Sequence, residues 1–169
     1  MSGNRSQDIQ LIKLAVQIEK DCLHFLEQFA QKSGENSQLT PFLQHMQNEV
    51  REDLETFESL LSPLETGMST EEIEDISLDD YVKKLQKTRS EKFYPSSKVS
   101  ELIDDFYNPI WILVYLAETL NEQADFYSSS AGDIFYENEK SSFINIALKK
   151  KDQADQVVKK KKEIISRFP

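Results

Sequence analysis

The feature that most constrains this chain is a helical spacing of its apolar residues along almost the whole sequence. In the first stretch, apolar side chains recur at intervals of three and four residues, which places them on one face of a helix. These positions are Leu11, Leu14, Ala15, Ile18, Cys22, Phe25, Leu26 and Phe29. The stripe stops before Lys32-Ser33-Gly34, and glycine commonly follows the end of a helix. We therefore predict a first long helix over residues 8 to 32.

Two further helix starts are marked by a capping residue followed by proline, a pair that suits the first turn of a helix. Thr40-Pro41 precedes a stripe that runs to about Ser62-Pro63, and Asn108-Pro109 precedes one that ends near Ala131-Gly132. A fourth stripe begins at about Tyr136 and continues to the end of the chain. We therefore expect three more long helices.

The segment between Pro63 and Asn108 has a weaker apolar pattern. It contains two capping-box sequences, Ser69-Thr70-Glu71-Glu72 and Ser77-Leu78-Asp79-Asp80. We predict short connecting helices here, one of them over about 78 to 92 and stopped by Tyr94-Pro95.

Four amphipathic helices joined by a short, a long and a short connection can bury their apolar faces only against one another. The predicted fold is therefore all-α, a four-helix bundle with one long crossover. A chain of 169 residues suits a single domain over residues 1–169. Within it we expect a hairpin at 8–63, the crossover at 64–108 and a second hairpin at 109–168.

The charge and the cysteine content narrow the classes of function. The net charge of −10 disfavours nucleic acid as a partner, because there is no cationic excess to meet phosphates. Lysines are concentrated at 149–151 and 159–162, in the last predicted helix. We interpret them as cations that interact favourably with the negative C-terminal end of the helix dipole, not as a nucleic-acid site. The sequence shows neither a signal peptide nor an apolar stretch of about 18 residues, so we expect no membrane contact and a cytoplasmic location. A single cysteine excludes an internal disulfide.

The chain offers few residues for catalysis. His24 and His45 are its only histidines, and neither belongs to a recognisable nucleophile–histidine–acid arrangement. We expect both histidines on the surface, and Cys22 as a small buried apolar residue rather than a reactive thiol. No catalytic residue is predicted, and whether the protein is an enzyme stays open at this point.

The two predicted hairpins share a common plan. Positions of the first hairpin fall on corresponding positions of the second: Ala15, Glu19, Cys22 and Phe25 on Ala117, Asn121, Ala124 and Tyr127, and Phe42, Met46, Glu49 and Glu52 on Phe143, Ala147, Lys150 and Gln153. Such self-similarity indicates an internal repeat of a helical hairpin.

These helices resemble those of a known family. Ile18 to Ala30 resembles the E-x-x-A-x-x-F-Y-x-x-L-A helix of rubrerythrins and related ferritin-like proteins, and Phe42 to Glu52 resembles their F-x-x-x-A-x-x-E-x-x-H helix. The resemblance covers all four long helices and leaves the crossover unmatched. It implies a ferritin-like fold in which a glutamate from each of two helices and an E-x-x-H pair from each of the others hold two metal ions.

Two sets of three positions correspond to the family's metal ligands. In the first hairpin they are Glu19, Glu49 and Glu52, and in the second they are Asn121, Lys150 and Gln153. Three carboxylates are too few for two hard cations, and the Lys150 ammonium would repel them. We therefore expect that the di-iron centre is lost and that no cofactor is bound. The alternative is iron or manganese on an altered carboxylate site that uses Glu19, Glu49, Glu52 or Asp53.

The helical positions of these residues predict a buried polar cluster. Lys150 lies near the centre of its apolar stripe, Glu19 and Asn121 lie closer to the flank of theirs, and Asp53 lies nearer to the centre than Glu49. A buried ammonium needs a carboxylate partner. We therefore predict a cluster of Glu19, Asp53, Asn121 and Lys150. In the alternative, Lys150 extends past the apolar stripe to solvent.

The helix that begins at 109 carries apolar bulk on two faces. Trp111, Ile112, Tyr115 and Leu116 lie opposite its main stripe. This second face requires a cover, which is either the connecting segment 70–92 or a second subunit in a homodimer. The identity of any other protein partner stays open.

Together these features favour a rubrerythrin-like bundle in a non-catalytic interaction or structural role. A metal-binding oxidoreductase or iron-handling protein of the rubrerythrin or ferritin type is the alternative. A bundle whose interior binds an apolar ligand is a third hypothesis.

Overall fold

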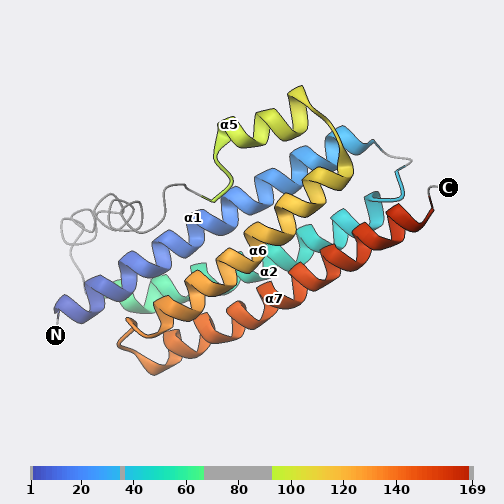
Figure 1. Cartoon of the computed structure of the whole chain (residues 1–169). Helices are drawn as coiled ribbons and strands as arrows, with labels where there is room; N and C mark the ends of the chain where they lie inside the picture. Colours follow the sequence, from blue (N-terminus) through green and yellow to red (C-terminus); the bar gives the residue numbers. More distant parts are fainter. Residues whose placement is uncertain (1, 35–36, 67–92, 168–169) are drawn as a thin grey trace.

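The protein is an all-α helical bundle in the computed structural model, which describes residues 2–34, 37–66 and 93–167. The helices in this part of the chain are α1 (Ser2–Ser33), α2 (Thr40–Glu65), α5 (Ser96–Val99), the π-helix η1 (Ser100–Asp105), α6 (Pro109–Ala131) and α7 (Glu137–Ser166). The four long helices lie lengthwise beside one another, and α5 lies on the outside of the bundle (Figure 1). The prediction of an all-α bundle is confirmed, and none of the described helices is long and apolar enough to cross a membrane.

The predicted helix ends agree best with the observed ones in the second hairpin. Asn108 caps α6, because its side-chain oxygen accepts hydrogen bonds from the backbone N–H groups of Ile110 and Trp111 at 3.0 and 3.4 Å. The α6 helix ends at Ala131 and α7 begins at Glu137, close to the expected positions.

The first hairpin differs from the prediction at its helix ends. The first helix starts at Ser2 rather than at residue 8, and α2 continues past Pro63 to Glu65. Thr40 is not the N-cap of α2, because Leu39 holds that position and the Thr40 hydroxyl donates to the carbonyl of Gly34 at 2.9 Å. Gly34 has a φ of +80°, a left-handed conformation that glycine adopts without steric cost, and this lets the chain turn directly after α1.

The segment before α6 contains two short helices, α5 and η1, which agrees with the prediction of short connecting helices between Pro63 and Asn108, although no bounds were predicted for these two. The α5 helix starts directly after Tyr94-Pro95, with Pro95 as its N-cap. The predicted connecting helix at 78–92 and both capping boxes lie outside the described residues.

The second apolar face of α6 is covered in part by this segment. Ile112 and Leu116 are fully buried, and they share a core cluster with Tyr94, Val99 and Ile103. The cover thus comes from residues 94–103, a segment that neither of the expected alternatives named. Trp111 on the same helix remains 67% exposed.

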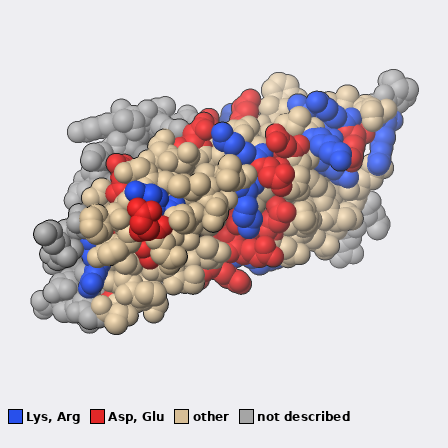
Figure 2. Space-filling model, turned by 90° about the horizontal axis from the view of Figure 1, so that it is seen from below, with Lys and Arg blue, Asp and Glu red and all other residues tan. Residues whose placement is uncertain are grey.

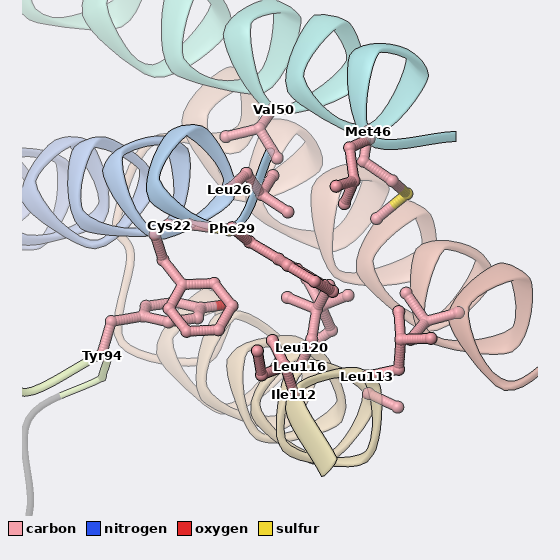
Figure 3. Packing of buried hydrophobic residues seen from close by; sticks show 14 of the residues in the cluster. Cys22, Leu26, Phe29, Met46, Val50, Tyr94, Ile112, Leu113, Leu116 and Leu120 are labelled. Atoms are coloured by element: carbon pink, nitrogen blue, oxygen red, sulfur yellow. The ribbon is translucent and has the colours of Figure 1, made fainter. Parts of the chain in front are cut away.

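The hydrophobic core consists of two clusters that follow one another along the bundle. On α1 the first cluster holds residues up to Ile18 and the second begins at Cys22. Figure 3 shows the second cluster, in which side chains of α1, α2 and α6 meet and Tyr94 reaches in beside Cys22. On each of the four long helices a buried polar residue lies at the change from one cluster to the other: Glu19, Asp53, Gln123 and Lys150.

Candidate functional site

A buried charge cluster lies between the two core clusters and receives a side chain from each long helix. Its members are Glu19 of α1, Asp53 of α2, Tyr127 of α6, and Lys150 and Gln153 of α7, all with 0% exposure. Glu19, Asp53, Lys150 and Gln153 each lie where their helix passes from one core cluster to the other. Tyr127 belongs to the first core cluster, and its hydroxyl reaches Glu19. All five side chains are therefore closed to solvent.

Lys150 is the centre of this cluster. Its Nζ lies 2.8 Å from Oε2 of Glu19 and 3.0 Å from Oδ2 of Asp53. The other oxygen of Glu19, Oε1, accepts a hydrogen bond from the Tyr127 hydroxyl at 3.1 Å, and Gln153 Nε2 donates to Asp53 Oδ2 at 3.1 Å. One ammonium thus joins α1, α2 and α7, and Tyr127 adds the fourth helix.

Lys149 links the cluster to the surface. Its ammonium is partly exposed and lies 2.5 Å from the second oxygen of Asp53, and 3.9 Å from the exposed carboxylate of Glu52. With Lys149 included, two carboxylates face two ammonium groups, so the formal charges cancel.

On the face drawn in Figure 2, positive and negative side chains are interleaved rather than separated into patches of one sign.

Burial and charge act in opposite directions on these groups. Burial by itself lowers the pKa of Lys150, but the carboxylates of Glu19 and Asp53 outweigh this effect and raise the pKa above its ordinary value. Burial raises the pKa of Glu19, the Lys150 ammonium opposes this, and the charge of Asp53 adds to it, with a net shift upward. Asp53 contacts two ammonium groups and Glu19 only one, so Glu19 is the less compensated carboxylate.

A second set of polar groups adjoins the cluster on the α5 side. The Tyr94 hydroxyl donates to Oε1 of Gln123 at 2.5 Å, and both residues are buried. Burial raises the pKa of the neighbouring Cys22 thiol to about 12, which keeps the thiol protonated at neutral pH.

The structure brings together only some of the residues that the sequence predicted. Glu19, Asp53 and Lys150 meet, and Lys150 does not reach solvent. Asn121 is exposed, so its expected place in the cluster is wrong. The reason is that α6 is buried on two sides, and Gln123 and Tyr127 occupy the inward positions at this level.

The residual ligand positions on α2 lie away from the cluster centre. Glu49 is partly exposed and pairs with His45, the two side chains being 3.0 Å apart on the surface. Glu52 is exposed and faces Lys149. Gln153 could have been added to the predicted cluster, because it follows Lys150 by three residues and shares its helix face. Tyr127 could not, because its spacing is that of an ordinary core aromatic.

The donor set does not fit a di-metal centre. Glu19 and Asp53 share one ammonium, which lies between their oxygens where a bridged cation would have to lie. Within the described part of the chain, no three side chains of the His, Cys, Asp and Glu types are grouped so that they could hold a metal ion.

Comparisons with known proteins add no relative. No protein-family model, curated protein or solved structure matches this chain.

Proposed function

We propose that this protein is a rubrerythrin-related, ferritin-like bundle that has lost its di-iron centre and now serves a non-catalytic interaction or structural role. The observation that carries the proposal is the Lys150 ammonium, which is fully buried and lies within 3.0 Å of carboxylates from two other helices. Two of the three residues, Glu19 and Lys150, occupy positions that correspond to metal ligands in the resembled family.

Electrostatics supports the replacement of metal by lysine. An ammonium between two carboxylates provides the positive charge that such a buried pair needs. It also disfavours a metal ion: a divalent cation 4 Å away would be repelled by about 8 kcal/mol at an effective dielectric constant of about 20. The fixed charge therefore neutralises the carboxylates and competes with metal for the same place.

The chemistry of the cluster supports a non-catalytic role. A lysine whose pKa is raised holds its proton and cannot act as a base or nucleophile at neutral pH. The Cys22 thiol is protonated for the reason given above, and every member of the buried charge cluster is closed to solvent. A substrate would have to part the helices to reach these groups.

Metal analysis tests the proposal directly. Protein purified without chelator is expected to hold far less than one iron or manganese per chain. Addition of either ion is expected to leave its melting temperature unchanged. About two ions per chain would overturn the proposal and favour the metal-binding oxidoreductase or iron-handling alternative.

A gain-of-binding variant sharpens this test. Lys150→Glu places a third carboxylate beside Glu19 and Asp53, so we expect Mn²⁺ to raise the melting temperature of this variant and not that of the wild type. Lys151→Glu is the matched control, because Lys151 is the next residue of α7 and is exposed. Equal responses of the two variants to Mn²⁺ would contradict the idea that Lys150 occupies the former metal position.

A further inference from the structure

Exposed aromatic side chains lie where η1 meets the start of α6. Phe106 is 73% exposed and Trp111 is 67% exposed, and Tyr107 between them is 37% exposed. The segment 94–103 covers Ile112 and Leu116 of α6 but leaves these aromatic residues to solvent. Large apolar side chains that are exposed close together commonly mark a surface that another molecule covers.

This aromatic surface is held in a fixed conformation. The backbone N–H of Phe106 donates to the carbonyl of Glu101 at 2.9 Å, and Asn108 caps the first turn of α6. The hydroxyl groups of Tyr107 and Ser33 are hydrogen-bonded at 2.9 Å, which ties the segment to the end of α1. A partner that covers these side chains therefore has little backbone entropy to remove.

Negative charge accompanies the aromatic side chains. Residues 101–111 contain three acids, Glu101, Asp104 and Asp105, and no base. All three acids are exposed. Lys98 lies 3.9 Å from Glu101, so Asp104 and Asp105 are the acids left to meet a partner. We call residues 101–111 the acidic aromatic surface, and its chemistry suits a partner with apolar and positively charged side chains.

The end of α7 carries that complementary chemistry. Residues 159–167, which we call the basic surface, contain five bases and one acid, and within them Ile165 is 48% exposed. Lys160 lies 3.6 Å from the single acid, Glu163, while Lys159 and Lys162 are exposed. The start of α6 and the end of α7 lie at the same end of the bundle (Figure 1). One end of the molecule thus carries both surfaces.

We propose that a second copy of this chain covers the acidic aromatic surface with its basic surface, in a two-fold symmetric dimer. Two-fold symmetry lets each copy give and receive the same contact, because both surfaces belong to one end of the bundle. The net charge of −10 makes two copies repel one another at a distance, so association requires an orientation that pairs these local opposite charges. The proposal goes beyond the function proposed above, because self-association requires nothing of the buried charge cluster.

The fluorescence of Trp111 tests the proposal, because Trp111 is the only tryptophan of the chain. We expect its emission to move to shorter wavelength as the concentration of the full-length protein rises from nanomolar to millimolar. The change is expected to follow the monomer–dimer equilibrium measured by sedimentation. A chain that sediments as a monomer throughout this range would overturn the proposal. If the emission of that monomer is already that of a covered tryptophan, the cover is another segment of the same chain.

Phe106→Ala tests the aromatic contact and keeps the fluorescent reporter. We expect this variant to weaken dimerisation by about tenfold or more, because it removes a large side chain from the interface. Phe135→Ala is the matched control and is expected to leave dimerisation unchanged. Phe135 is 59% exposed but lies between the end of α6 and the start of α7, at the other end of the bundle. Equal weakening by the two variants would show that the assigned surface is wrong.

A charge exchange tests which surfaces meet. Asp104→Lys/Asp105→Lys and Lys159→Glu/Lys162→Glu each place like charges opposite one another, so each variant alone is expected to be monomeric where the wild type is dimeric. An equimolar mixture of the two variants is expected to dimerise again, because both contacts then join opposite charges.

The double variant Lys20→Glu/Lys151→Glu is the control for net charge. Both lysines are exposed and lie outside the basic surface, so we expect it to dimerise like the wild type. A mixture of the two charge-reversed variants that stays monomeric would show that these surfaces do not face one another. A mass that continues to rise beyond that of a dimer would rule out the two-fold arrangement.

Discussion

Lys150 keeps two carboxylates together that would repel one another in its absence. Its ammonium is within hydrogen-bond distance of Glu19 and Asp53. Tyr127 donates to the other oxygen of Glu19, and Gln153 donates to the same oxygen of Asp53 that Lys150 contacts. A buried charge that loses its partner is far more costly than the pair is stabilising, since the remaining charge has neither water nor a counter-ion. The consequences of changing these residues therefore depend on whether one partner or both are removed.

Lys150→Met is expected to lower the free energy of unfolding by about 3–5 kcal/mol, because it leaves two carboxylates buried without their shared cation. Urea denaturation followed by circular dichroism measures the loss. Lys151→Met is the control, and we expect a change within about 0.5 kcal/mol because Lys151 is exposed on the same helix. Equal losses in the two variants would show that Lys150 is not paired as the structure has it.

The buried lysine also predicts a loss of stability at high pH. The folded protein holds the Lys150 proton at pH values where the unfolded chain, with an ordinary pKa of 10.5, releases it. The stabilising contribution of Lys150 is thus complete below about pH 10.5 and is lost as the pH rises through the folded-state pKa.

The raised pKa values of Tyr94 and Tyr127 act in the same direction. The double variant Glu19→Gln/Lys150→Met lacks the lysine, and it also lacks the Glu19 charge that helps to raise the pKa of Tyr127. We therefore expect its free energy of unfolding to fall less steeply between pH 10 and pH 12 than that of the wild type. Equally steep profiles from urea titrations at each pH would contradict this assignment.

Among the elements, the helix ends show how far local sequence signals reach. Asn108-Pro109 predicts the start of α6 because the cap is a local interaction between neighbouring residues. The same kind of pair at Thr40-Pro41 places the N-cap of α2 one residue too late, because Leu39 is the N-cap. The Thr40 hydroxyl instead donates to the carbonyl of Gly34, across the turn. Short connecting helices were expected between Pro63 and Asn108, but the bounds of α5 and η1 could not be predicted, because helices this short have no repeated apolar spacing.

Asn108→Ala is expected to lower the free energy of unfolding by about 1 kcal/mol, because two backbone N–H groups at the start of α6 lose their acceptor. Thermal or urea denaturation checks the value. Asn121→Ala on the same helix is the control. It is expected to be neutral or slightly stabilising, because Asn121 is exposed and alanine is the better helix former. A large loss in the control would instead place Asn121 in the buried charge cluster.

For the molecule as a whole, the sequence predicts the bundle better than it predicts the site. Apolar spacing identifies the four long helices, and a chain with such helices must pack them together. The position of Asp53 nearer to the stripe centre than Glu49 correctly indicated which acid of α2 faces inward. The partnership of Tyr127 and Gln153 with the cluster depends on the relative rotation of all four helices, which no single helix pattern specifies.

The two core clusters are expected to unfold together, because the buried charge cluster ties three helices at their boundary. Native-state hydrogen exchange measures this: amides at Leu14 in the first cluster and Leu26 in the second are expected to share one opening free energy, equal to that of global unfolding. A clearly lower value at either residue would show that one half of the bundle opens by itself.

The polar layer between the core clusters also sets the lengthwise alignment of the helices. Contacts between hydrocarbon side chains are non-directional, so two apolar helix faces can shift past one another at a modest cost in free energy. A slip of α7 by one turn, about 5.4 Å, would carry the Lys150 cation out of reach of both acids and into hydrocarbon. The polar layer therefore restricts the helices to one lengthwise alignment during folding. Shifted or reversed arrangements would bury their apolar surfaces nearly as well, but they would separate the buried charges.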